Sequence, residues 1–217
     1  MIKLSNIAVM NFENAIRGMR NPLNSWSKSD SYTDENGVFV MGENDLALAT
    51  KLANAGSDHR KFLRQILVSV DILAPLYWWK EFDTYKVGTV ANSCSTMHKI
   101  HAKEFTLDDF STERLEPYAL DAIRCVIERL NWYRNSYNRA KSAPPSPYNE
   151  CDMEACWYNM IQLLPTSYNQ LRTVTLNYEA LRNMHHARKA HKLDEWRELC
   201  KQIETLPYSE LITGVRV

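Results

Sequence analysis

Glycine is scarce in this chain, which has 6 glycines among its 217 residues. None of them belongs to a Gly-x-Gly-x-x-Gly fingerprint or to a P-loop, and no Gly-x-Ser-x-Gly elbow is present. These absences argue against a Rossmann dinucleotide-binding protein, a P-loop kinase and an α/β-hydrolase.

Long apolar runs and a net charge are also missing. No stretch of about 18 apolar residues occurs, and the N-terminus lacks the apolar segment of a secretory signal. The 26 basic residues equal the 26 acidic residues in number, so no overall field draws the chain to nucleic acid or to an anionic membrane. We therefore expect a cytoplasmic protein without nucleic acid or membrane partners, which captures any anionic ligand locally.

Neither the cysteines nor the histidines form a familiar metal-binding pattern. The 5 cysteines include no C-x-x-C pair, so we expect reduced, mostly structural thiols. The histidines form two groups that could in principle hold a metal, but neither group matches a ligand signature. They are His98 and His101, and then His185, His186 and His191. We expect solvated or capping histidines and no metal site.

Strand and helix patterns alternate in the first 85 residues. Short β-branched runs predict strands at residues 3–10, 38–41 and 66–73. Helical patterns follow them at residues 12–20, 46–56 and 76–85. Pro75 is expected in the first turn of the last of these helices.

Longer helical patterns begin at residue 115. They predict helices at residues 115–140, 149–164, 171–189 and 193–206. No linker separates them from the first part of the chain. The sequence therefore predicts an α/β (α+β) fold, with a small β-sheet packed against long helices in a single domain, residues 1–217.

One helical stripe is a candidate ligand site. Asn177, Leu181, Met184 and Arg188 recur at steps of four, three and four residues, so they share one face of a helix. In a pocket, the two apolar side chains would pack against a flat ring. Asn177 would form hydrogen bonds with an amide edge of the ligand, and Arg188 would bind a phosphate or a carbonyl. The alternative is an ordinary amphipathic helix that ends in an arginine, since most such stripes pack into a core.

An aromatic segment, APLYWWKEFDTY at residues 74–85, is followed by the small polar loop GTVANSCST. Aromatic clusters of this density usually fill a core or a subunit interface, but they also suit stacking on a flat ligand. The polar loop suits close approach of a ligand to backbone amides. Both interpretations stay open at this point.

The C-terminal part of the chain resembles the flavin-dependent thymidylate synthases, which are unrelated to the synthases with a cysteine nucleophile. In that family a Leu-Pro pair is followed, at a fixed distance, by a helix with two asparagines and an arginine, and then by a histidine and an acidic residue. The matching residues are Leu164-Pro165, Asn177, Asn183, Arg188, His191 and Glu195, with a single-residue adjustment before His191.

The resemblance implies a protein that binds FAD and a pyrimidine nucleotide. It implies that Asn177 and Asn183 contact the flavin or the folate against it, and that Arg188 contacts the uracil nucleotide. The implied reaction of nucleotide biosynthesis moves a one-carbon unit from methylenetetrahydrofolate to C5 of dUMP, while NADPH reduces the flavin. The family is homotetrameric, with its flavin across subunit interfaces, which would explain why Asn183 lies far around the helix from Asn177.

The signature loop of the family is altered in this chain. The family has Arg-His-Arg, two variable residues and Ser, followed by Ser-x-Arg; here the corresponding segments are TYKVGT (84–89) and CST (94–96). The resemblance leaves Lys86 and Thr89 as flavin contacts and Ser95 as a nucleotide contact. A lysine supplies a point charge but not the bidentate fork that arginine offers to a phosphate.

The family's phosphate-binding arginines are therefore largely absent, and one more of them falls on Ile161. Each bidentate pair of this kind contributes roughly 1.5 to 3 kcal/mol. Candidate replacements are Arg60, Lys61, Arg64 and Arg172, of which Arg172 is the predicted substrate contact.

Three interpretations remain open. The chain is an FAD-dependent methyltransferase of the thymidylate synthase type, acting on dUMP or a related nucleotide. Alternatively, it is a catalytically degenerate protein of the same fold that sequesters or senses a nucleotide. In the third interpretation, it is a structural oligomer whose C-terminal resemblance is coincidental.

Overall fold

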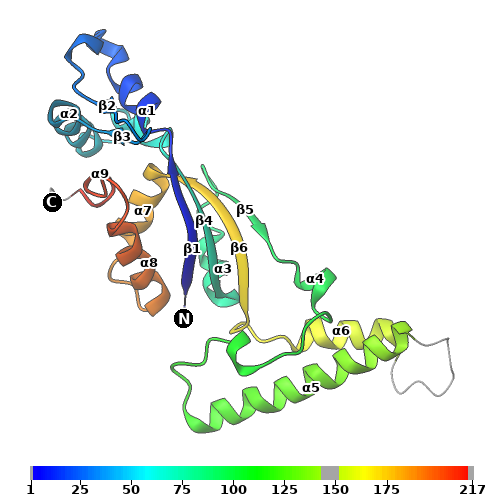
Figure 1. Ribbon diagram of the computed structural model, residues 1–217. Helices are drawn as coiled ribbons and strands as arrows, with labels where there is room; N and C mark the ends of the chain where they lie inside the picture. Colours follow the sequence, from blue (N-terminus) through cyan, green and yellow to red (C-terminus); the bar gives the residue numbers. More distant parts are fainter. Residues whose placement is uncertain (1, 143–151, 215–217) are drawn as a thin grey trace. The chain divides into compact units, whose positions relative to one another are not determined.

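The computed structural model describes residues 2–142 and 152–214, in which strands and helices are mixed (Figure 1). The chain forms two compact units. Among the described residues, the first contains 73–82, 93–142 and 152–172, and the second contains 2–72, 83–92 and 173–214.

The main sheet has four strands in the order β1-β4-β6-β5. The strands are β1 (Lys3–Met10), β4 (Leu67–Pro75), β6 (Asn169–Asn177) and β5 (Val90–Ser93). Burial alternates along β4, where Val68, Val70 and Ile72 are buried and the residues between them are partly exposed. This period of two is expected for a strand that has one face on a core.

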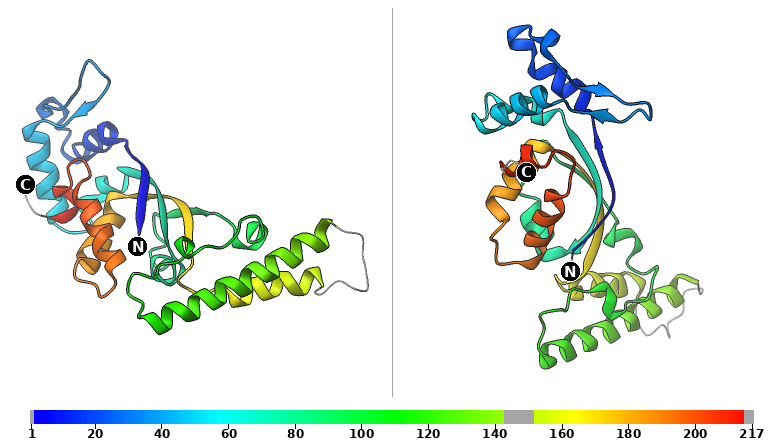
Figure 2. Two further views of the ribbon diagram at one scale, coloured as in Figure 1. Left: turned by 60° about the horizontal axis from the view of Figure 1, so that its bottom comes forward. Right: turned by 60° about the vertical axis from the view of Figure 1, so that its left-hand side comes forward.

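Within the second unit, helices cover one face of this sheet (Figure 2). The helices of the unit are α1 (Phe12–Met19), α2 (Glu43–Asn54), α7 (Tyr178–Arg188), α8 (Asp194–Glu204) and α9 (Glu210–Thr213). The strands β2 (Tyr32–Thr33) and β3 (Phe39–Val40) form a short antiparallel pair. The short 3₁₀ helices are η1 (Asn21–Leu23), η2 (Trp26–Lys28) and η3 (Arg60–Arg64).

A buried ion pair ties α1 to α2. Arg20 Nε lies 2.5 Å from Asp45 Oδ1, and the two side chains are 5% and 0% exposed. The hydroxyls of Ser29 and Ser31 donate to the other carboxylate oxygen at 2.5 and 2.6 Å. Burial acts to raise the pKa of Asp45, but these two hydroxyls and Arg20 outweigh it and hold the pKa below the ordinary value.

The first unit is dominated by two helices that pack side by side. They are α5 (Pro117–Ser142) and α6 (Met153–Leu163), accompanied by α3 (Leu76–Phe82), α4 (Thr96–Lys99) and the 3₁₀ helix η4 (Leu107–Asp109). Asp152 begins α6, because its carboxylate accepts a hydrogen bond from the Ala155 N–H. The buried centre of this unit consists of Ile100, Phe105, Phe110, Leu130 and Met160.

The predicted fold class is confirmed, since the structure combines a small sheet with long helices. The strand predicted at residues 3–10 has the observed bounds. The helix predicted at 171–189 is wrong in its first part, because residues 171–177 belong to β6. Pro75 ends β4 instead of opening α3, and β2, β5 and β6 were not predicted. The predicted start of a helix at residue 149 lies outside the described residues.

The expectation that the cysteines are reduced is wrong at one position. Cys156 is disulfide-bonded, whereas Cys94, Cys125 and Cys200 are free. Burial, followed by the nearby charge of Glu204, raises the pKa of Cys200 to about 11. In residues 2–142 and 152–214, no helix is long and apolar enough to cross a membrane.

Candidate functional site

Asn177 stands where β6 passes directly into α7. Its backbone is extended (φ −121°, ψ 168°), and its side-chain Oδ1 accepts a hydrogen bond of 2.9 Å from the Ala180 N–H. This bond satisfies one of the free N–H groups at the start of a helix, so Asn177 is the N-cap of α7. The next residue, Tyr178, donates its backbone N–H to the Ile66 carbonyl at 3.0 Å.

The loop at residues 84–89 lies against this helix start. Gly88 has a φ of +71°, and a Cβ built on it would lie 2.4 Å from Asn177 Nδ2. Both the backbone conformation and the available space therefore require glycine. The hydroxyl oxygen of the neighbouring Thr89 is buried, and it has no hydrogen-bond partner within the described part of the chain.

The same loop also contacts the other end of α7. Arg188 donates from Nε to the Tyr85 hydroxyl at 3.0 Å. Its guanidinium carbon lies 4.8 Å from the Trp196 ring centroid and 5.7 Å from that of Tyr85. A cation over aromatic rings is stabilised by their electron-rich faces, so Arg188 is held in one orientation.

The structure does not bring every predicted contact to this loop. Asn183 is exposed, and six residues of helix place it about 120° around the helix from Asn177. Lys86 is exposed on the loop itself. Ser95 belongs to the first unit, where its hydroxyl accepts the His98 N–H at 3.1 Å and caps α4.

Arg172 also belongs to the first unit, in β6. Its Nε donates to Gln170 Oε1 at 3.0 Å, and its guanidinium lies 4.2 Å from the Trp79 ring centroid. The Trp79 ring N–H donates to the Gln170 carbonyl at 3.0 Å. Trp78, Trp79 and Phe82 of the aromatic segment are all buried, as expected for residues of a core.

Two of the candidate replacement cations are bound to a carboxylate. Arg60 and Arg64 both form ion pairs with Glu179 in the first turn of α7. Burial acts to raise the pKa of Glu179. The hydrogen bonds and charges of Arg64 and Arg60 lower it by a larger amount, so the pKa of Glu179 lies below the ordinary value. Lys61 is exposed.

Sequence reasoning missed Arg182, which is 7% exposed. Its Nη1 donates to the Leu211 and Ile212 carbonyls at 3.0 and 3.2 Å, and its Nη2 donates to Asn54 Oδ1 at 2.9 Å. Burial lowers its pKa. Arg182 therefore satisfies carbonyl groups of α9, and no local motif distinguishes it from a surface arginine.

Two of the histidines, His185 and His191, make contacts within the second unit. His185 Nε2 lies 2.8 Å from Glu204 Oε1, and His191 Nδ1 accepts the Leu193 N–H at 3.2 Å. In the described ranges, no three His, Cys, Asp or Glu side chains are grouped so that they could hold a metal ion.

Comparison with known proteins reveals a likeness of structure. No family model matches the chain, and no curated protein matches it by sequence. Thymidylate Synthase X (ThyX) from Helicobacter pylori with FAD and dUMP has a TM-score of 0.66 and 16% identity, covering 98% of each chain. A second structure of that flavin-dependent enzyme with FAD and dUMP gives 0.64 and 16%, covering 96% of this chain and 98% of the other.

The UMP/dUMP methylase PolB from Streptomyces cacaoi, bound with 5-Br dUMP, is similar at a TM-score of 0.57 and 12% identity. That match covers 94% of this chain and 89% of the methylase. Identities this low show a common fold and leave the ligands to be inferred. The chain thus has the fold of the flavin-dependent thymidylate synthases.

Proposed function

We propose that this chain binds FAD and a pyrimidine nucleotide, and transfers a one-carbon unit to C5 of dUMP or a related nucleotide. One observation carries the proposal: two segments that the family resemblance selects separately, 84–89 and 177–188, meet twice. Gly88 meets Asn177, and Tyr85 meets Arg188. The solved structures that share the fold contain FAD, dUMP or 5-Br dUMP.

The residues at this junction fit a flavin through hydroxyl and amide groups. The Thr89 hydroxyl lacks a hydrogen-bond partner among the described residues and can bond to a phosphate or a ring oxygen. The start of α7 adds the partial positive charge of a helix N-terminus. When bound, FAD supplies the redox chemistry, with NADPH as reductant and methylenetetrahydrofolate as one-carbon donor.

The chain's own groups would position the reactants. Arg188, oriented by Tyr85 and Trp196, would place a fixed positive charge at the nucleotide. Lys86 would add a mobile charge from the loop, and Ser95 and Arg172 are further proposed nucleotide contacts. We further propose a homotetramer in which the exposed Asn183 contacts the flavin of a neighbouring subunit, with residues 1–217 acting as one domain.

A second candidate, a nucleotide-binding protein without turnover, is favoured by the charges around α7. Arg60 and Arg64 are bound to Glu179, so they do not replace the missing phosphate-binding arginines without breaking an ion pair. Such a protein would keep the pocket for sequestering or sensing and lose the reaction.

Flavin absorbance provides the first test. After incubation with FAD and removal of unbound cofactor, we expect the protein to retain the blue absorbance of an oxidised flavin. A colourless protein would reject the flavin-dependent enzyme. With flavin bound, release of tritium from dUMP labelled at C5, in the presence of NADPH and methylenetetrahydrofolate, separates the enzyme from the non-catalytic protein.

Arg188→Ala tests the nucleotide site. We expect it to weaken dUMP binding at least about tenfold, equivalent to about 1.4 kcal/mol, because a charge-assisted contact is lost. Lys189→Ala is the matched control, since Lys189 is exposed at the same helix end. Equal affinity of the two variants would contradict the proposed role of Arg188.

A further inference from the structure

Positive charge is concentrated in one part of the first unit. From Arg129 to Ser142, the second half of α5 contains 4 arginines and lysines and no acidic residue. The segment 96–103 contains 2 lysines and 2 histidines and again no acidic residue. The chain as a whole has no net charge, so this is a local enrichment.

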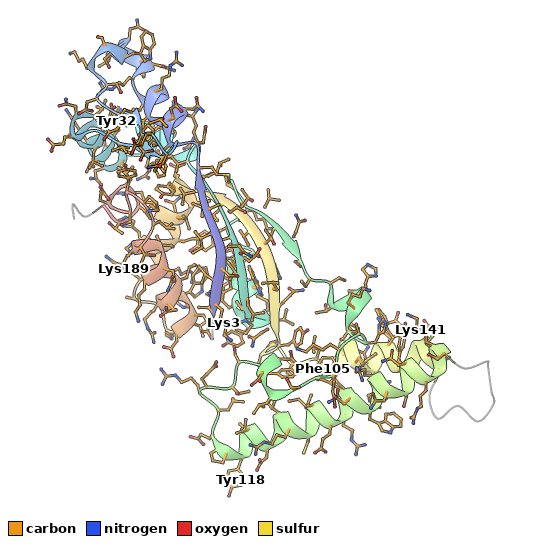
Figure 3. All side chains as sticks on the ribbon, viewed as in Figure 1. Lys3, Tyr32, Phe105, Tyr118, Lys141 and Lys189 are labelled. Atoms are coloured by element: carbon orange, nitrogen blue, oxygen red, sulfur yellow. The ribbon has the colours of Figure 1, made fainter. Side chains whose placement is uncertain are left out.

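These two segments pack against each other. Arg134, Tyr137, Asn138 and Lys141 follow one another at helical spacing and form one stripe of α5. His101 lies on this stripe: its ring centroid is 4.6 Å from that of Tyr137, and its carbonyl accepts the Asn138 amide N–H at 3.0 Å. Arg134 and Lys141 therefore lie one helical turn to either side of the His101 contact. Figure 3 shows Lys141 near the C-terminal end of α5.

Two polar atoms of this cluster are buried without a partner. His101 Nδ1 and Arg134 Nε have no hydrogen bond within the described ranges. A buried donor of this kind loses its bonds to water without replacement, which is unfavourable. Burial, followed by the charges of Lys141, Lys99 and Arg134, also lowers the pKa of His101.

The helix dipole of α5 explains only some of the positive charges in the second half of this helix. Cations are favourable in the last turn of a helix, which accounts for Arg139 and Lys141. Arg134 lies about two turns from the end of α5, and the dipole provides no hydrogen-bond acceptor for its Nε. Lys103 is not part of the cluster, because its ammonium group is paired with Asp109 at 2.6 Å.

We propose that Lys99, His101, Arg134 and Lys141 form a binding site for the phosphate group of a small molecule. A phosphate carries several strong acceptor oxygens, which can accept from Arg134 Nε and from His101 Nδ1 when that nitrogen carries the proton of the neutral ring. Its negative charge offsets the repulsion among the cations. The overall neutrality of the chain favours a small ligand over a long polyanion. All four residues belong to the first unit and none is used in the flavin proposal, so the two proposals are tested separately.

Phosphate titration of the full chain tests the site. In proton–carbon spectra of the histidine rings, we expect inorganic phosphate to shift the His101 signal saturably, with that signal identified by its loss in His101→Gln. Calorimetry with inorganic phosphate and with dUMP distinguishes the free ion from a phosphomonoester. Saturable binding of either one, accompanied by the shift of the His101 signal, supports the site, and a titration in which the His101 signal does not shift overturns it.

Matched variants localise the binding. Arg134→Gln and Lys141→Gln should each weaken phosphate binding at least tenfold, whereas Arg129→Gln should change it twofold at most. Arg129 is exposed on the same helix, five residues from Arg134, so the change of net charge is the same. Lys141 is exposed, so its variant keeps the test valid if Arg134→Gln fails to fold. Equal weakening by Lys141→Gln and Arg129→Gln, or tighter binding of a 12-nucleotide single strand than of phosphate, would overturn the proposal.

Discussion

The two units differ in how the buried nitrogen atoms of their arginines are satisfied. In the second unit, Arg182 donates to three oxygen acceptors, and Arg20 is paired with Asp45. In the first unit, Arg134 is half-buried and its Nη1 donates to Asn135 Oδ1 at 2.8 Å, but its Nε is buried without a partner among the described residues. Burial of a cation therefore does not mark a ligand site by itself. The distinguishing property is a buried donor whose acceptor is missing.

The largest effect is expected when the partner of a buried arginine is removed. Asp45→Asn should lower the free energy of unfolding by about 3 to 5 kcal/mol, because it leaves Arg20 buried without its counter-charge. Chemical denaturation measures this change. Glu43→Gln removes an exposed charge from the first turn of the same helix, and should cost less than about 1 kcal/mol. Similar losses for both variants would show that the Arg20–Asp45 pair is not a structural requirement.

The same pair predicts a dependence of stability on pH. Because the folded protein holds the pKa of Asp45 below the ordinary value of 3.8, the ionised form stabilises the fold. This contribution is fully present above that value and is lost as the pH falls through the lower, folded pKa. The wild type should therefore lose stability more steeply than Asp45→Asn below about pH 4.

Gly88→Ala should have the next largest effect. Its positive φ costs a residue with a side chain about 1 to 2 kcal/mol, and the new Cβ would also collide with Asn177 Nδ2. Gly37→Ala is a close control, because Gly37 has a φ of +78° and nothing within 4 Å of its Cβ position. We expect Gly88→Ala to weaken FAD binding and Gly37→Ala to leave it unchanged. If both variants bind FAD equally, the contact between the loop and α7 is not part of the flavin site.

Variants of Asn177 separate structure from ligand binding at a single residue. Asn177→Ala should cost about 1 kcal/mol of stability, because the helix loses its N-cap. Asn177→Ser keeps a capping oxygen and removes only the amide, so it should retain most of the stability. Denaturation and FAD titration of both variants are the measurements. Normal FAD affinity in Asn177→Ser would leave Asn177 with a structural role alone.

The smallest effect on stability is expected from modification of the free thiols, which differ in burial and therefore in reactivity. With a pKa of about 11, Cys200 has about one thiolate per thousand molecules at pH 8. Cys94 and Cys125 are exposed. Iodoacetamide should therefore modify these two before Cys200, with little change in stability, as read by peptide mass spectrometry. Modification of all three at one rate would mean that Cys200 is not protected by burial in solution.

Local sequence patterns predicted elements that have a clear period or a capping signal. β1 and the strand of β4 follow from β-branched apolar runs, and α2 is preceded by turn-forming residues. β6 was missed, because the helical stripe through Leu181 and Met184 was extended backward over Thr173-Val174-Thr175, which is typical of a strand. β2 and β5 are too short and too exposed to produce a pattern.

The candidate site was only partly predictable for a different reason. The spacing of Asn177 and Arg188 indicated the two residues that stand at the ends of α7, although the helix itself was predicted to begin at residue 171, and the resemblance indicated the loop at 84–89. The role of Tyr85 as the partner of Arg188 depends on a contact between residues about a hundred positions apart, which only the folded chain defines. Arg182 was not predictable, because its acceptors are backbone carbonyls of α9.

The direct passage from β6 into α7 at Asn177 also makes the length of this segment critical. No loop residue lies between the strand and the helix, so the junction cannot absorb an insertion. One added residue in β6 would exchange the two faces of the strand beyond it, and one added in α7 would rotate Arg188 by about 100° away from Tyr85. The number of residues from Pro165 to Arg188 therefore fixes where Arg188 stands relative to Tyr85, so an insertion or deletion in this segment should separate the two side chains.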